Sequence, residues 1–264
     1  MTAPFATRVL TAATRLRMRG RPWSYIANVV AAIAAGALDP EDVRQGVANA
    51  WELRQPEDRE HFELMAWEQH LVEQVAPPNA RMLIVGSGAG RDLVGFARLG
   101  FHVTGIEPAP LAAQASIDAL RARGLEGRVL RGFAEDVDID GVFETVVFSY
   151  FCYGYIPGAS RRIALLEKLR TSLAPSARIV LTYNPRSGNS LTALTQLSAW
   201  LLRSQWRPED GDGVYLMASA DAPFAVEHLF HDAEIVDEAR HAGYDCALRG
   251  NVGEVRMALL AARR

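Results

Sequence analysis

A glycine-rich turn between two short apolar runs constrains the fold of this chain more than any other feature. Residues 82–85 are apolar and too few for a helix, and the sequence Gly-Ser-Gly-Ala-Gly follows at 86–90. From Arg91 onward, apolar residues recur at helical spacing, and residues 103–106 repeat the short apolar run before Glu107. This order predicts a buried strand, a tight turn, a helix and a second, parallel strand.

The turn and the acid after the second run are spaced as in a nucleotide-type site. Glycines allow the backbone to approach a ligand closely, and a carboxylate about 20 residues beyond them can accept both hydroxyls of a ribose. Asp92 falls in the first turn of the expected helix, where the helix dipole favours an acid. We therefore expect a ligand at the carboxyl edge of a parallel sheet.

The position of the third glycine separates two classes of ligand. Turns that bind dinucleotides read Gly-x-Gly-x-x-Gly, and Arg91 occupies the last of those positions here. The glycines instead read Gly-x-Gly-x-Gly, at Gly86, Gly88 and Gly90. This pattern resembles the first motif of the class I S-adenosylmethionine-dependent methyltransferases. The resemblance covers residues 80–264 and is strongest in the first third of that span.

This resemblance implies an α/β fold: a Rossmann-like, doubly wound sheet of seven strands with a last antiparallel strand. It implies a helical cap at residues 1–79 and a methyltransferase-like domain at 80–264 with an insertion near 184–226. The implied cofactor is S-adenosylmethionine. The residues expected to bind it are Gly86, Ser87, Gly88, Gly90, Asp92, Glu107, Pro108, Ala134, Glu135, Asp136, Ser149 and Tyr150. Either Glu135 or Asp136 would bind the adenine amino group.

Periodicity and turn residues extend the pattern along the rest of the chain. A single helix is expected over residues 57–75, bounded by prolines, and another over 190–206. Further strands are expected at 128–130, 142–150, 178–183, 214–218, 225–230, 245–249 and 254–261, with a helix between Asp232 and Gly243.

The acceptor side of the reaction is less constrained by sequence. Residues 149–155 are rich in aromatic side chains, which can face a cationic sulfonium and pack a flat acceptor. They lack the Asn/Asp-Pro-Pro-Tyr/Phe pattern of many methyltransferases that act on bases. His228 is a candidate catalytic residue, because an imidazole can take a proton from a hydroxyl acceptor near neutral pH. Tyr153, in the aromatic segment, is the second candidate. A buried structural histidine is the alternative for His228.

Composition narrows the partners. With 264 residues and a formal net charge of −3, the chain lacks the basic balance typical of nucleic-acid binding, so a small-molecule acceptor is expected. The two cysteines lie far apart and the histidines lack ligand spacing, so we expect no metal and a reducing, cytoplasmic setting. Residues 23–38 are largely apolar but shorter than the ~20 residues of a spanning helix. A helix packed on or over the domain is therefore predicted there.

Three other functions remain open from the sequence. An NAD(P)-dependent oxidoreductase shares the strand–turn–helix arrangement, but Arg91 at the third glycine position disfavours it. A cofactor-binding or partner-binding protein without transfer activity fits the missing acceptor motif. Aminopropyl transfer is a minor fourth reading. The oligomeric state is not predicted.

Overall fold

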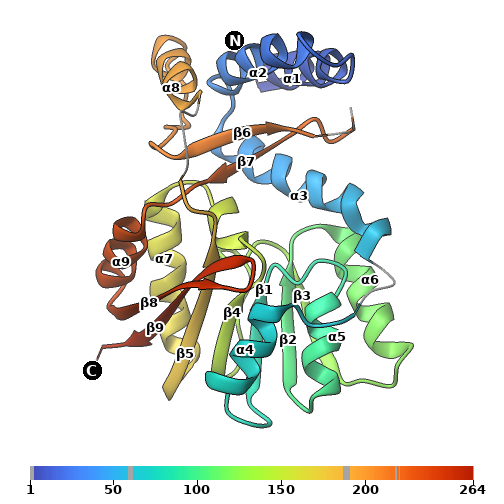
Figure 1. Ribbon diagram of the computed structural model, residues 1–264, viewed down its shortest axis with the longest axis vertical. Coiled ribbons are helices and arrows are strands. Elements are labelled where there is room, and N and C mark those ends of the chain that lie inside the picture. The colour runs from blue at the N-terminus through green and yellow to red at the C-terminus, as the bar shows by residue number, and fades with distance from the viewer. Residues whose placement is uncertain (1–2, 59–61, 187–190, 218, 220, 264) are drawn as a thin grey trace. The chain divides into compact units, whose positions relative to one another are not determined.

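The computed structural model describes residues 3–58, 62–186, 191–217, 219 and 221–263 (Figure 1). The chain divides into two compact units. The helical unit comprises Met1–Leu53, Gly154–Gly158 and Arg186–Leu229. The sheet unit comprises Arg54–Tyr153, Ala159–Pro185 and Phe230–Arg264. The expected cap and the expected insertion thus lie largely in the helical unit.

The sheet unit is built on a seven-stranded sheet in the order β3-β2-β1-β4-β5-β9-β8 (Figure 1). The strands β3, β2, β1, β4 and β5 are parallel to one another, and β9 runs antiparallel to both β5 and β8. This confirms the expected doubly wound sheet with its last antiparallel strand. Its strands are β1 Arg81–Val85, β2 His102–Glu107, β3 Gly127–Arg131, β4 Phe143–Phe148, β5 Leu173–Tyr183, β8 Tyr244–Val252 and β9 Val255–Ala262.

Helices connect the parallel strands and bury their apolar faces against the sheet. Met82 and Ile84 of β1 share a core with Leu93 and Phe96 of the following helix, and all four are fully buried. Each such side chain contributes about 1.5–3 kcal/mol through burial. The helices of this unit are α4 Ala66–Gln74, α5 Arg91–Arg98, α6 Pro110–Arg121, α7 Ala159–Leu169 and α9 Asp232–His241, and short 3-10 turns span Cys152–Tyr155 and Arg170–Ser172.

The single helix expected over residues 57–75 is wrong. The helix α3, Pro40–Asp58, continues through Pro56, and α4 begins only at Ala66. Residues 62–65 are not helical, because tertiary contacts hold them against α5: an added Cβ at Gly95 would lie 2.4 Å from a methyl carbon of Leu64. Local periodicity continues through this segment, but its packing partners lie elsewhere in the chain.

The helical unit has its own core. Two strands pair antiparallel, and small alanines let α1 and α2 pack closely against them with Leu10, Trp206 and Phe224. The elements of this unit are α1 Ala3–Arg17, α2 Trp23–Ala35, most of α3, α8 Thr192–Leu201, β6 Asp212–Leu216 and β7 Phe224–His228. The helix expected over 190–206 is therefore shorter, and its first position, 190, lies outside the described residues. No helix in the described part of the chain is long and apolar enough to cross a membrane.

Candidate cofactor-binding edge

The glycine-rich turn after β1 has the left-handed backbone that its sequence requires. The φ angles of Gly86, Gly88 and Gly90 are +77°, +54° and +90°. An added Cβ would lie 2.9 Å from the Cys152 Cβ at Gly86 and 2.9 Å from the Ser116 Cα at Gly90. At Gly88, by contrast, no other part of the described chain lies within 4 Å of that point. The turn is thus closed at both ends and open at its middle glycine.

The acid expected on the ribose lies beside this open glycine. The Glu107 carboxylate is buried at the end of β2, where its Oε2 accepts a hydrogen bond from the Gly88 N–H at 2.8 Å. Its Oε1 accepts one from the Ala109 N–H, also at 2.8 Å. Two backbone donors therefore fix the carboxylate at the carboxyl edge of the sheet. Pro108 separates Glu107 from Ala109, in the loop that leads to α6.

Ser87 and Asp92 lie beneath the turn. The Ser87 side chain is buried against Gly105 of β2, so it faces the sheet. Asp92 is buried, and its Oδ2 accepts a hydrogen bond from the Ser149 hydroxyl at 2.6 Å. Burial raises the pKa of the Asp92 carboxyl above its ordinary value. This pair joins the turn after β1 to the end of β4.

Arg91, at the position of the missing third glycine, has a structural partner that the sequence did not reveal. Its guanidinium binds both carboxylate oxygens of Glu68 on α4, each at 2.6 Å. The Glu68 side chain is fully buried, and burial raises the pKa of its carboxyl above the ordinary value, an effect that the arginine opposes. The Met65 N–H also donates to Glu68 at 2.7 Å, which fixes the start of α4.

The loop after β3 begins next to Glu107, since the Gly132 N–H donates to the Glu107 carbonyl at 3.0 Å. Ala134 is buried, whereas Asp136 is exposed and Glu135 is intermediate. Lys168, the sole lysine, donates from Nζ to the carbonyls of residues 134, 135 and 137 at 3.1, 3.0 and 2.5 Å. These hydrogen bonds hold the loop in place. They do not show whether Glu135 or Asp136 is the acid expected to bind adenine.

The aromatic segment after β4 contains an unusual backbone position. Phe151 has a φ of +64°, in a region that residues with a Cβ rarely adopt. Its N–H donates to the Thr182 hydroxyl of β5 at 2.8 Å, and its ring lies 4.3 Å from the Tyr150 ring, centroid to centroid. Tyr150 itself is 36% exposed, so its side chain remains accessible. Strained backbone of this kind clusters at functional sites.

Tyr153 lies apart from this accessible surface. It is fully buried, and its hydroxyl donates to the Glu238 carboxylate of α9 at 2.6 Å. Burial, with the nearby carboxylate, raises the pKa of the Tyr153 hydroxyl well above its ordinary value. Arg162 of α7 also binds Glu238, at 2.6 Å. These contacts hold the Tyr153 hydroxyl within the core of the sheet unit, and its catalytic role stays a prediction.

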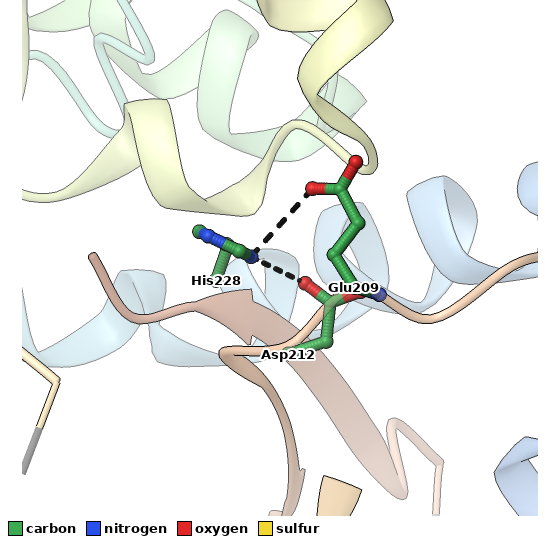
Figure 2. Close-up of side chains that lie close together, drawn as sticks. All are labelled: Glu209, Asp212 and His228. Carbon is green, nitrogen blue, oxygen red and sulfur yellow. Dashed lines mark hydrogen bonds and ion pairs between the residues drawn. The ribbon is translucent and has the colours of Figure 1, made fainter. Parts of the chain in front are cut away.

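His228 belongs to the helical unit, where it pairs across the β6–β7 hairpin with Asp212 (Figure 2). The ring Nδ1 lies 2.7 Å from Asp212 Oδ1 and 3.8 Å from Glu209 Oε2. The ring also packs on Gly211, where an added Cβ would lie 2.9 Å from the His228 Cε1. Sequence reasoning missed both acids, because Glu209 and Asp212 precede the strand expected at 214–218, whereas β6 already begins at Asp212. The signal for Asp212 was the hairpin register, which places it opposite His228.

The same three side chains form a possible metal-ligand set, with one ligand atom from each within 4.8 Å of the others. Ligand atoms of a tetrahedral zinc lie about 3.3 Å apart, from the bond lengths of such sites. The 2.7 Å between His228 Nδ1 and Asp212 Oδ1 is a hydrogen-bond distance instead. We therefore describe this cluster as a histidine oriented by a carboxylate.

No protein-family model and no curated protein sequence matches this chain. Solved structures do match it. A SAM-dependent methyltransferase from Methanosarcina mazei is 16% identical, with a TM-score of 0.59 over 76% of this chain and 100% of that one. The glycopeptide N-methyltransferase MtfA in complex with S-adenosyl-L-methionine is 16% identical, with a TM-score of 0.56 over 75% of this chain and 93% of that one.

A third match is a sugar N-methyltransferase from Streptoalloteichus sp, 14% identical, with a TM-score of 0.56 over 78% of this chain and 89% of that one. At these identities the likeness concerns the fold. The chain thus has the fold of the class I S-adenosylmethionine-dependent methyltransferases, as the glycine pattern indicated.

Proposed function

We propose that this protein binds S-adenosylmethionine at the carboxyl edge of β1 and β2 and transfers its methyl group to a small-molecule acceptor. The observation that carries the proposal is the open Gly88 beside the buried Glu107 carboxylate. A side chain at position 88 would fill the space that a ligand needs, and an anchored carboxylate can accept hydroxyl groups there. The pattern Gly-x-Gly-x-Gly and the fold support this cofactor over a dinucleotide.

Different residues would contact different parts of this cofactor. Gly86, Gly88 and Gly90 allow close backbone approach, and Glu107 would accept the ribose hydroxyls. The loop at 134–136, fixed by Lys168, supplies the acid for the adenine amino group. The hydrogen bond from Ser149 to Asp92 would support the turn from the side of the sheet. The accessible Tyr150 ring could contact the cofactor. When bound, S-adenosylmethionine supplies an electrophilic methyl group for in-line displacement.

His228 is proposed as the group that takes the proton from a hydroxyl acceptor. Asp212 Oδ1 lies 2.7 Å from Nδ1 of the buried imidazole, and a proton on Nδ1 would make Nε2 the basic nitrogen. Carboxylates orient catalytic histidines in this way in other enzymes. An acceptor that reacts through an already deprotonated amine would not need this base.

A melting experiment tests the cofactor. We expect S-adenosylmethionine and S-adenosylhomocysteine to raise the melting temperature, because a ligand at about 100 times its Kd stabilises the folded state by about 2.7 kcal/mol. NAD(H) and NADP(H) should leave it unchanged. A response to a nicotinamide cofactor alone would instead indicate an oxidoreductase.

The role of His228 is tested by transfer of labelled methyl groups to a panel of phenols, sugars and amines. For a hydroxyl acceptor, we expect His228→Gln to lower kcat about 10²–10⁴-fold, the usual contribution of a positioned base. Asp212→Asn should lower kcat through the altered tautomer. The Kd for S-adenosylhomocysteine should stay the same in both variants. Unchanged kcat with a hydroxyl acceptor would remove the proposed role.

A further inference from the structure

The surface of the helical unit carries exposed apolar side chains on two adjoining helices. Tyr25, Ile26 and Ile33 of α2 are exposed, and they recur at helical spacing on one face, whereas Ala27 and Ala31 on the opposite side are buried in the core. Tyr25 is 70% exposed. A helix that is apolar on both its buried and its exposed side is atypical of a helix that faces water.

The second helix continues this surface. Leu197, Trp200 and Leu201 of α8 are exposed, and Trp200 is 72% exposed. The two helices meet near the end of α2, where an added Cβ at Gly36 would collide with the Ser198 side chain. We refer to Tyr25, Ile26, Ile33, Leu197, Trp200 and Leu201 as the α2–α8 surface. Exposed apolar surface gathered in this way marks an interaction site in soluble proteins.

Arginines are the charged residues of these two helices and their immediate flanks. Residues 1–38 and 191–207 contain seven arginines and no aspartate or glutamate, and acids begin just beyond them, at Asp39, Glu41 and Asp42 after α2 and at Glu209 and Asp210 after α8. Arg19 and Arg21 are exposed and come just before α2 begins. Arg203 is exposed near the other end of α2, since the neighbouring Ser204 hydroxyl donates to the Leu38 carbonyl at 2.7 Å. Exposed arginines therefore lie beside the apolar face just before α2 and just after α8.

We infer that the α2–α8 surface docks on the surface of an anionic lipid bilayer. Apolar and aromatic side chains at the centre can enter the interface between headgroups and acyl chains, where tryptophan and tyrosine are favoured. Arginines at the rim can pair with anionic headgroups. The helices lie along the interface in this arrangement and do not cross the bilayer. The inference is independent of the methyl-transfer proposal.

Two other occupants fit less well. A second copy of this chain would bring the same arginines together across a symmetric contact, and like charges oppose such pairing. The phosphates of a nucleic acid could pair with the arginines, but they would leave the apolar centre without a partner, because affinity for nucleic acid comes mainly from phosphate contacts. The bilayer satisfies both features, and the other two are outcomes that the experiment separates.

The test is cosedimentation of the full chain with vesicles. We expect binding to vesicles of phosphatidylcholine and phosphatidylglycerol in equal amounts, weak binding to phosphatidylcholine alone, and loss of binding at high salt. Tryptophan fluorescence should shift to the blue on binding, and the shift should be smaller in Trp200→Phe, because the chain contains five tryptophans. Equal affinity for both vesicle types, or no binding to either, would overturn the inference.

Matched variants locate the surface. Replacing Arg19 and Arg21 by glutamine should weaken binding to the anionic vesicles about 25-fold, at about fivefold per arginine. Replacing the exposed Arg98 and Arg121 of the sheet unit in the same way should change it less than twofold. Trp200→Glu should weaken binding tenfold or more, whereas Leu111→Glu, at a residue 60% exposed on α6, should not. Equal effects of patch and control variants would contradict the inference.

Sedimentation velocity and an RNA competitor complete the test. We expect the chain without vesicles to sediment as a monomer, and a large excess of RNA to leave vesicle binding in place at moderate salt. A dimer that Trp200→Glu dissociates would assign the surface to a second copy. Release of the protein from vesicles by RNA at low competitor would assign it to nucleic acid. Either result overturns the lipid inference.

Discussion

Replacing Arg162 by methionine is expected to lower the free energy of unfolding of the sheet unit by about 3–5 kcal/mol. The Arg162 side chain is 1% exposed, and its guanidinium binds the nearly buried Glu238 carboxylate through both Nε and a terminal nitrogen. Removing the arginine leaves the Glu238 charge buried, with the Tyr153 hydroxyl still donating to it. Urea unfolding followed by circular dichroism measures the loss.

Three further variants separate pairing from packing in that network. Tyr153→Phe removes a single hydrogen bond to a charged group and should cost about 1.5–3 kcal/mol. Arg240→Met breaks an exposed pair with Asp237 on the same helix as Glu238 and should cost less than about 1 kcal/mol. Arg162→Met combined with Glu238→Leu should recover most of the stability. A loss below about 1 kcal/mol in Arg162→Met alone would show that the pair is not a main support of this core.

Replacing Glu107 by alanine is expected to weaken S-adenosylhomocysteine binding by about 100-fold or more. Two ribose hydrogen bonds to a carboxylate, at about 1.5 kcal/mol or more each, account for that loss. Isothermal titration calorimetry measures the Kd, and the melting temperature without ligand reports whether the domain stays folded. The carboxylate also holds the turn, so the loss needs a control.

Ser116→Ala is the matched control for the turn. The Ser116 hydroxyl donates to the Gly88 carbonyl at 2.7 Å, so its removal frees one anchor of the turn without touching the carboxylate. We expect that variant to lose less than about tenfold in affinity. In addition, a 2′-deoxy analogue should bind the native protein more weakly but bind Glu107→Ala as well as the parent ligand does. Equal losses in both variants would assign the effect to the turn and remove the ribose assignment.

The strand–turn–helix–strand unit could be predicted from sequence because each of its features is local. Three glycines need positive φ, and one acid ends the next strand. The start of α4 could not, because the Glu68 carboxylate that accepts the Met65 N–H there is paired with Arg91, a residue 23 positions away. Periodicity carries no information about such a partner.

The same limit applies to the candidate catalytic residues. An aromatic segment predicts a wall for a ligand, but only the fold shows that Tyr153 turns inward to Glu238 while Tyr150 stays accessible. His228 could be named from sequence as a candidate base, because an imidazole titrates near neutral pH. Its carboxylate partner comes from the opposite strand of a hairpin, where Asp212 is 16 residues away in sequence. Pairing across strands of this kind depends on register, which a single sequence specifies weakly.

Hydrogen exchange measured by mass spectrometry, with and without S-adenosylhomocysteine, tests the central claim most directly. We predict slower exchange on binding in peptides that cover residues 85–92, 105–110 and 132–137, and no such change with NAD. Those peptides contain the glycine turn, Glu107 and the loop that Lys168 contacts. Slower exchange at these peptides with NAD but not with S-adenosylhomocysteine, or unchanged exchange there while the ligand binds, would contradict the account.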